Sequence, residues 1–337
     1  MNTVDRPRVG VSVMPLENRR EVLTGLATTA DRLGYDGFFL PEAWGYDTTV
    51  LLADAAARTR RITLGTGILG VWSRSAATIA MAAATLHAVS GGRFALGLGA
   101  STAQLVEGLH DVPFRAPAAR MRRTITQVRA LLRGERVPLG EMTGARALKL
   151  NAPPAPDLPM YLAGLADESV RLAGELADGW LPFLYPLSRL ADGAKRLAEG
   201  AARTGDPHRQ LAIHPSVPTV VAADPAKARE GAAWFVAFYL STMGTLYRTS
   251  LVRQGFDKEV AAVLGANTPK FTGAVPSEAD RLLEELIVFG TPAEARARLA
   301  RWHAAGTSMP VLLLRPSLSP EEIELTLAAF GPMLAHR

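Results

Sequence analysis

Residues 93–102 read Arg-Phe-Ala-Leu-Gly-Leu-Gly-Ala-Ser-Thr, an apolar run that ends in small and hydroxyl residues. The run predicts a buried strand, and the small residues after it predict a tight turn into a helix. A turn without bulky side chains lets backbone N–H groups approach a phosphate at the start of that helix. The first hypothesis is therefore a phosphorylated cofactor. The alternative is that the glycines only allow tight strand-to-helix packing.

Seven more apolar runs flank this stretch and alternate with helical patterns. They predict strands at residues 8–13, 37–41, 62–68, 159–165, 180–184, 211–217 with 219–222 as an extension, and 311–314. Apolar strands separated by helices predict a parallel sheet that is covered on both faces. Residues 224–291 are mostly helical and longer than one crossover requires, so we expect an insertion there.

This order of elements predicts one α/β domain over residues 1–337, a (β/α)8 TIM barrel with a helical insertion between strands 7 and 8. A doubly wound sheet is the alternative, but no acidic residue stands about 20 positions after Gly-x-Gly to bind a ribose. Asn18, Asp47, Ser75 and Asp167 are the expected helix caps, and Thr291 with Glu294 forms a capping box. A stretch rich in glycine and proline, 134–156, predicts a surface excursion or small hairpin.

Composition excludes several classes of function. The chain has 37 basic and 32 acidic residues, but the basic ones are scattered and never form a block. A nucleic-acid-binding face would need a basic stripe with interleaved aromatics, which the sequence lacks. The absence of cysteine excludes disulfides and thiolate nucleophiles. His110 and His214 are isolated and lack the spacing of metal ligands, so we expect no metal site.

Nothing in the sequence predicts export or membrane insertion. Residues 1–8 are polar and lack the apolar core of a signal peptide, and no apolar run reaches about 18 residues. We therefore expect a cytoplasmic protein that binds neither membranes nor nucleic acids.

The C-terminal ends of the strands are where a barrel of this kind places its active site. Glu42 ends an apolar strand, which makes it a candidate acid, base or ligand-orienting group. The alternative is a structural carboxylate paired with an arginine such as Arg74. Trp44 stands beside Glu42, and we take both as candidate catalytic residues, with Trp44 also serving as a wall.

Glycines and other small residues mark three strand ends. In residues 64–70, Leu-Gly-Thr-Gly-Ile-Leu-Gly, alternating glycines indicate either close approach of a planar ring or a β-bulge. Residues 163–165 repeat the small-residue pattern of 100–102, and both ends could offer N–H donors to one phosphate unless Asp167 repels it. The candidate cofactor-binding residues are Glu42, Gly67, Ile68, Ser101, Thr102, Ala163, Gly164 and Leu165.

Several stretches together resemble the bacterial luciferase-like monooxygenase superfamily, and within it the coenzyme F420-dependent oxidoreductases of actinobacteria. They are residues 36–42, 61–68, 73–75, 85–93, 96–101 and 161–180, among which Leu172-Ala-Gly-Glu-Leu-Ala-Asp-Gly179 is one of the most specific. The resemblance implies a TIM barrel with an insertion between the seventh and eighth strands and FMN or F420 bound at its C-terminal mouth. It also implies a bulge with a non-prolyl cis peptide, here at Gly67–Ile68, and a phosphate near Ser101, Thr102, Gly164 and Leu165.

One position departs from this pattern. Relatives often carry histidine after the acid that ends the second strand, whereas Ala43 follows Glu42 here. Glu42, a tyrosine or a group of the substrate must then exchange the proton, unless the reaction needs no protein acid at that point.

We therefore predict an oxidoreductase that moves a hydride between C5 of F420 and a small organic substrate, held by Trp44, Phe183 and Tyr247. One alternative is a monooxygenase that uses O2 and reduced FMN from a partner reductase. Another is a cofactor-binding protein without turnover. A homodimer through the helix at 75–89 and a separate F420- or flavin-reducing partner enzyme are further expectations.

Overall fold

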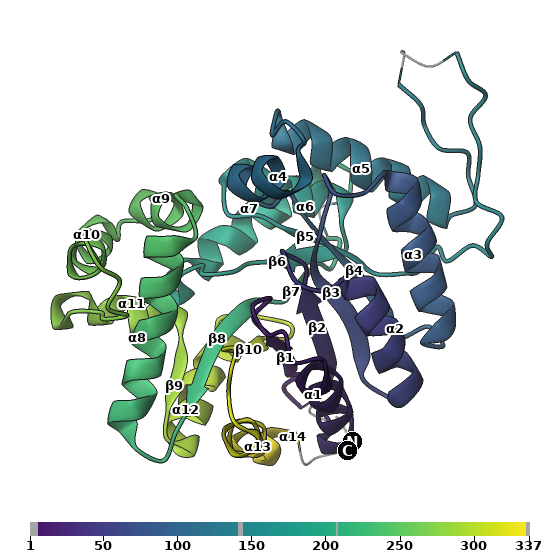
Figure 1. The fold of residues 1–337 in the computed structure, drawn as a ribbon. Coiled ribbons are helices and arrows are strands. Elements are labelled where there is room, and N and C mark those ends of the chain that lie inside the picture. The colour runs from purple at the N-terminus through teal and green to yellow at the C-terminus, as the bar shows by residue number, and fades with distance from the viewer. Residues whose placement is uncertain (1–5, 141–143, 207, 335–337) are drawn as a thin grey trace.

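A parallel β-barrel surrounded by helices forms the centre of the computed structural model (Figure 1), which describes residues 6–140, 144–206 and 208–334. Neighbouring strands pair in parallel in the order β7-β6-β5-β4-β3-β2-β1-β10-β8-β9. Their bounds are β1 (Gly10–Val13), β2 (Gly37–Pro41), β3 (Thr63–Gly70), β4 (Phe94–Gly99), β5 (Met160–Ala163), β6 (Gly179–Leu181), β7 (Ala212–Ile213), β8 (Ser216–Val221), β9 (Val288–Gly290) and β10 (Val311–Leu314). The predicted barrel is confirmed.

The seventh barrel position closes the ring of strands. On one edge, the N–H of His214 donates to the carbonyl of Trp180 at 3.0 Å and that of Ser216 donates to Pro182 at 2.9 Å. On the other edge, the N–H of Val311 donates to the carbonyl of Pro215 at 2.8 Å. The predicted seventh strand is thus present but divided into β7 and β8, because Pro215 has no N–H for the ladder.

Helices cover the outside of the barrel, and four of them form the insertion seen to one side in Figure 1. Around the barrel lie α1 (Arg20–Leu33), α2 (Thr48–Arg58), α3 (Ala76–Val89), α4 (Ala103–His110), α5 (Pro117–Leu132), α6 (Asp167–Leu176), α7 (Leu190–Ala202), α12 (Pro292–Ala304), α13 (Pro320–Ala329) and α14 (Gly331–Leu334). The insertion contains α8 (Pro225–Thr242), α9 (Leu246–Arg253), α10 (Asp257–Ala266) and α11 (Asp280–Leu286). It also contains β9, which the sequence analysis missed because three residues show no periodicity.

Most expected helix starts are confirmed, and two are wrong. Asp47 and Ser75 cap α2 and α3, and the capping box at Thr291 opens α12. Asn18 does not cap α1, which begins after Arg19 without a side-chain cap. Asp167 is the first residue of α6 rather than its cap, because its carboxylate pairs with Arg196 at 3.0 Å instead.

The glycine- and proline-rich stretch extends away from the barrel beside α5 (Figure 1), and the N–H of Val137 bonds the carbonyl of Leu148 across it at 2.8 Å. The predicted excursion is therefore present, except that residues 141–143 lie outside the described ranges.

The insertion has an apolar core of its own. Side chains of α8 to α11 pack together there, and Met14, Leu184 and Leu313 join them from the ends of barrel strands. The barrel strands and their covering helices form a separate, larger cluster. Met14 follows β1, and Leu313 is the last residue but one of β10. The insertion is therefore anchored at the C-terminal mouth of the barrel.

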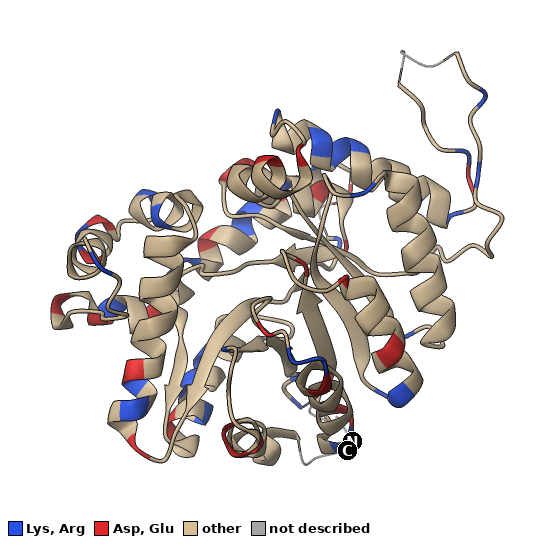
Figure 2. Cartoon of the chain, viewed as in Figure 1, with Lys and Arg blue, Asp and Glu red and all other residues tan. Residues whose placement is uncertain are grey.

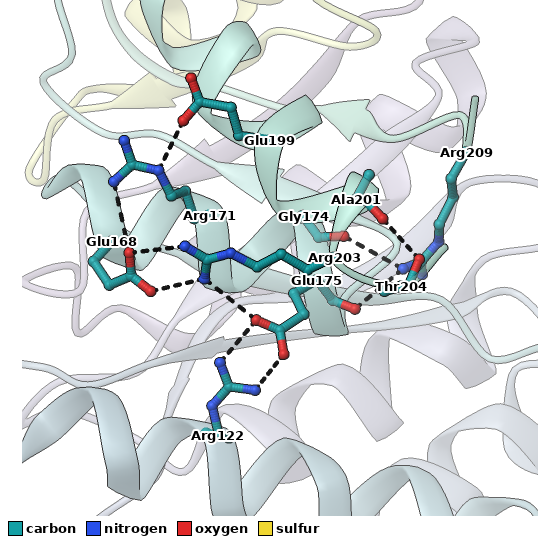
Figure 3. Close-up of polar contacts among 10 residues, drawn as sticks. All are labelled: Arg122, Glu168, Arg171, Gly174, Glu175, Glu199, Ala201, Arg203, Thr204 and Arg209. Atoms are coloured by element: carbon teal, nitrogen blue, oxygen red, sulfur yellow. Dashed lines mark hydrogen bonds and ion pairs between the residues drawn. The ribbon is translucent and has the colours of Figure 1, made fainter. Parts of the chain in front are cut away.

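Helices α6 and α7 cross with their backbones in contact. A Cβ atom on Gly174 would lie 1.9 Å from the carbonyl oxygen of Leu197, and one on Gly200 would lie 1.9 Å from that of Arg171. Figure 3 shows the ion pairs that bridge these helices, with Arg203 bonding Glu168 at 2.8 Å and Arg171 bonding Glu199 at 2.8 Å. Only glycine fits at the crossing.

A methyl group at this crossing should destabilise the fold. We expect Gly174→Ala to lower the free energy of unfolding by at least about 2 kcal/mol, because a backbone carbonyl cannot move aside as a side chain can. Gly25→Ala in α1 is the matched control, since nothing lies within 4 Å of its added Cβ. This variant should raise the free energy of unfolding by about 0.5–1 kcal/mol. Urea unfolding measures both, and equal effects would contradict the close crossing.

Glu17 joins the loop after β1 to the loop after β10. Its side chain is 2% exposed and accepts hydrogen bonds from the Arg19 side chain at 2.6 and 2.8 Å, from the Arg19 N–H at 2.9 Å and from the Ser317 N–H at 3.0 Å. Burial alone would raise the pKa of this carboxyl, but the hydrogen bonds outweigh burial and lower its pKa to about 2. Glu17 is therefore a charged structural group at the barrel mouth.

This lowered pKa predicts a specific acid sensitivity. The contribution of Glu17 is fully present above its unfolded pKa, near 4.5, and is lost as the pH falls toward about 2. We expect Glu17→Gln to lower the free energy of unfolding at neutral pH by on the order of 3 kcal/mol and to flatten its decline between these two pH values. Urea unfolding across that range tests this, with the exposed Glu230→Gln as control; parallel curves for wild type and Glu17→Gln would contradict it.

Candidate active site

The ends of β2, β3 and β4 and the helix α4 enclose a cleft at the C-terminal mouth of the barrel. It has about 300 Å³ of atom-free space, part of it open to solvent. Its lining residues are Glu42, Ala43, Ile68, Gly70, Trp72, Ser73, Ser101, Leu105, Val106 and His110. Three predicted site residues, Glu42, Ile68 and Ser101, thus meet in one place. A second cleft of about 320 Å³ lies on the other side of Ala43.

Glu42 is held in place by backbone and side-chain contacts. Its N–H donates to the carbonyl of Ile68 at 2.9 Å, and its carboxylate forms an ion pair with Arg74. Arg74 also bonds Asp47 at 2.8 Å, so the guanidinium joins two carboxylates. Burial would raise the pKa of Asp47, but the bonds from Thr49 and the charge of Arg74 outweigh it and lower that pKa. The arrangement matches the alternative stated above, a carboxylate paired with Arg74.

The third strand carries the expected bulge. Leu40 pairs with Thr66 while the next residue, Pro41, pairs with Ile68, so Gly67 is the extra residue. A Cβ on Gly67 would lie 3.1 Å from the Pro41 nitrogen, which explains the glycine. The expected cis bond at Gly67–Ile68 is wrong: within the described ranges only Thr268–Pro269 is cis. Without a Cβ on Gly67, the bulge accommodates its extra residue through a trans peptide.

The end of β4 packs closely against its two neighbouring strands. A Cβ on Gly99 would lie 3.1 Å from Ile68 Cγ2 and 3.7 Å from Ala163 Cβ, so the absence of a side chain lets Ile68 lie this close to β4. Ser101 follows with a φ of 62°, a left-handed conformation that non-glycine residues adopt mainly at constrained sites. The Thr102 hydroxyl then accepts from the Leu105 N–H at 3.4 Å and caps α4.

The three predicted residues at the end of β5 have different environments. Ala163, the last residue of the strand, packs beside Gly99. A Cβ on Gly164 would come within 2.7 Å of Ser169 Cβ, and the Gly164 carbonyl accepts from the Trp180 indole at 2.8 Å. Gly164 therefore serves close packing against α6. Leu165 packs against the barrel core, and neither residue lines the cleft described above.

An aromatic cluster lies over the end of β6. The centre of the Phe183 ring lies 4.8 Å from that of Tyr239 and 5.4 Å from that of Tyr247, each edge-on, so the three side chains are neighbours. Burial raises the pKa of Tyr247 to about 12 and that of Tyr239 well above its usual value, so both phenols stay neutral. Trp44 is 46% exposed and lines neither cleft.

Sequence reasoning missed Trp72, Ser73, Leu105 and Val106 as lining residues, and it considered His110 only as a metal ligand. The signal for α4 was its spacing, because Thr102, Val106 and His110 are four residues apart and share one helix face. His214 lies elsewhere, against Tyr161 at 4.8 Å between ring centres. Burial, with a smaller effect of Arg8, lowers its pKa to about 3, so it stays neutral.

Within the described ranges, no group of three or more His, Asp or Glu side chains is placed to hold a metal ion. Over the same residues, no helix has both the length and the apolar character needed to cross a membrane.

Comparison with known proteins finds relatives along nearly the whole chain. A Mycobacterium tuberculosis protein assigned to the coenzyme F420-dependent oxidoreductases is 34% identical over 322 residues, covering 88% of this chain and 91% of the relative. The 5,10-methylenetetrahydromethanopterin reductase of Methanolobus tindarius is 27% identical over 281 residues, covering 81% and 84%. The solved coenzyme F420-dependent tetrahydromethanopterin reductase of Methanopyrus kandleri has the same fold, with a TM-score of 0.77 and 19% identity over 97% of each chain.

These relatives confirm the resemblance drawn from the sequence. The family model described as luciferase-like monooxygenase matches residues 3–309, which include every barrel strand except β10. The chain therefore belongs to the luciferase-like monooxygenase family.

Proposed function

We propose that this protein is a coenzyme F420-dependent oxidoreductase that transfers a hydride between C5 of the deazaflavin and a small organic substrate. The observation that carries the proposal is the cleft in which Glu42, Ile68 and Ser101 meet next to the start of α4. Two of the three relatives described above are named for the same cofactor.

The residues present fit a ring with a phosphate tail. The cleft lined by Ile68, Gly70 and Ser101 is where the ring and its tail would lie. The first N–H groups of a helix lack intrahelical partners, and the positive end of the helix dipole favours an anion. Ser101 and Thr102 lie at this helix start, so we assign them to the phosphate, with Gly67, Ile68 and Ala163 beside the ring. Gly164 and Leu165 would then act by packing the neighbouring loop.

When bound, F420 supplies a two-electron carrier whose reactive atom is ring C5. The chain's own residues position the partners and exclude water. Glu42 and Asp47 hold Arg74 at the rim of the cleft. Phe183 and Tyr247 would form the apolar substrate wall, and the neutral phenol of Tyr247 can donate a hydrogen bond to the substrate. We retain Trp44 as a rim residue of this wall, where its exposure leaves it free to cover a substrate.

A charge placed at Ser101 tests the phosphate site. Asparagine and aspartate both tolerate the left-handed backbone of Ser101 and differ mainly in charge. We expect Ser101→Asp to weaken F420 binding at least about tenfold by repelling the phosphate, while Ser101→Asn stays near wild type. Fluorescence titration measures both. Equal affinities of the two variants would remove Ser101 from the site, and binding of FMN in place of F420 would favour a flavin monooxygenase.

We also propose a homodimer that meets through α3. This helix carries no Asp, Glu, Lys or Arg and is uncharged along its whole length in Figure 2, yet Met81 is 57% and Val89 52% exposed. An apolar helix face of this kind is typical of a buried interface. A cytoplasmic setting with a separate F420-reducing enzyme completes the proposal, because hydride transfer in one direction requires the cofactor to be regenerated.

Charge on α3 should separate the subunits. We expect the double variant Met81→Lys and Val89→Lys to sediment as a monomer at concentrations where the wild type is a dimer, because two like charges would face their copies across the interface. Val252→Lys on α9 is the control, since Val252 is also exposed, at 45%, but lies in the insertion. Analytical ultracentrifugation decides this, and a monomeric wild type would refute the dimer.

A further inference from the structure

His110 is the last residue of α4 and lines the cleft assigned to the cofactor. Two features of the helix fix its position. Val106, one turn earlier, is 1% exposed and anchors the helix, and the helix ends immediately afterwards because Asp111 adopts a left-handed conformation with its N–H bonded to the Val106 carbonyl. The half-buried imidazole thus belongs to the wall of the cleft that faces Glu42 and Ala43.

Only two of the ten lining residues have ionisable side chains, Glu42 and His110. Glu42 is engaged by Arg74, as described above. The imidazole of His110 makes no hydrogen bond or ion pair with another residue of the described ranges, so both of its nitrogens remain available to a ligand. Ser73 and Ser101 contribute hydroxyls, which are poor proton carriers near neutral pH, and Ala43 contributes a methyl group.

The charged groups around His110 come from four segments of the chain. Glu42 and Arg74 lie on the loops after β2 and β3. Arg120 of α5 stacks over Trp72, with its guanidinium carbon 5.3 Å from the ring centre, and donates to the carbonyl of Val71 at 3.0 Å. Asp111 follows His110 directly, and Glu107 on α4 accepts from the Phe114 N–H at 3.0 Å. Glu42, Arg74, Arg120 and Glu107 each have a partner of their own, which leaves His110 to exchange protons.

We propose that His110 is the proton-exchanging residue of this cleft, a role that rests on the hydride transfer proposed above. Reduction of a polar C=O or C=N bond adds a hydride to carbon and a proton to the heteroatom. The reduced deazaflavin provides the hydride and its electron pair, and the imidazolium of His110 provides the proton and becomes neutral. In the reverse direction the neutral imidazole accepts the proton from the alcohol or amine. Imidazole suits both directions because it changes charge between about pH 5 and 8.

The first test needs no substrate. In protein labelled with ¹³C at histidine Cε1, the His110 signal is assigned by its loss in His110→Gln, and its titration is followed with and without F420. We expect saturating F420 to shift the His110 midpoint by at least about 0.5 pH unit. The exposed His208 in the loop after α7 should be unchanged. If the protein quenches F420 fluorescence, and so binds F420, but the His110 midpoint does not change, only the role of His110 is overturned. If the protein does not quench F420 fluorescence, the proposed function and the role of His110 are both overturned.

The second test uses reduced F420 and the small carbonyl compound that the wild type reduces fastest. We expect His110→Gln to lower kcat about 100-fold and to flatten the dependence of kcat on pH between about 5 and 8, with cofactor affinity within about twofold of wild type. The His208→Gln variant should match the wild type in kcat, in the pH dependence of kcat and in cofactor affinity. A His110→Gln variant with wild-type kcat and pH profile overturns the proposal, and circular dichroism checks that both variants are folded.

Discussion

The closure of the barrel by residues 212–217 is the constraint on which the rest of the structure depends. Their backbones form hydrogen bonds with β6 and the residues after it on one edge and with the first residue of β10 on the other. The strands therefore form a ring and not an open sheet. In a ring of parallel strands all C-terminal ends meet at one mouth. Side chains from strands that are far apart in sequence, such as Glu42 and Ser101, therefore line one cleft.

Glycines, which have no side chain, shape that mouth as much as the larger residues do. Gly67 lets the third strand bulge against Pro41, and Gly99 lets Ile68 pack across the end of β4. Three residues shortly after strands, Ser101, Leu184 and Ser317, adopt left-handed backbone conformations, which proteins concentrate at functional sites. The tight crossing of α6 and α7 supports the loop after β5 from outside. Close packing, both at the mouth and at this helix crossing, thus depends on glycine.

The sequence was sufficient to predict the barrel and the insertion, because buried parallel strands are uninterrupted apolar runs. It also marked three residues that line the cleft, Glu42, Ile68 and Ser101. It was not sufficient for features that depend on contacts distant in sequence. The division of the seventh strand at Pro215 and the strand β9 follow from pairing partners and not from local periodicity. Asp167 reads as a cap until Arg196 of α7 is placed beside it. The trans bond at Gly67 and the place of His110 in the cleft likewise require coordinates.

The separate core of the insertion has an evolutionary consequence. Tyr239 and Tyr247 are carried by helices that pack mainly on one another and reach the barrel through a few residues such as Met14 and Leu313. The cleft at Ile68 and Ser101, by contrast, is lined by the ends of barrel strands and by α4. Mutations that reshape the aromatic wall can accumulate in the insertion without disturbing the strands beneath it. A lineage built on this plan can acquire new substrates while it inherits the same redox partner.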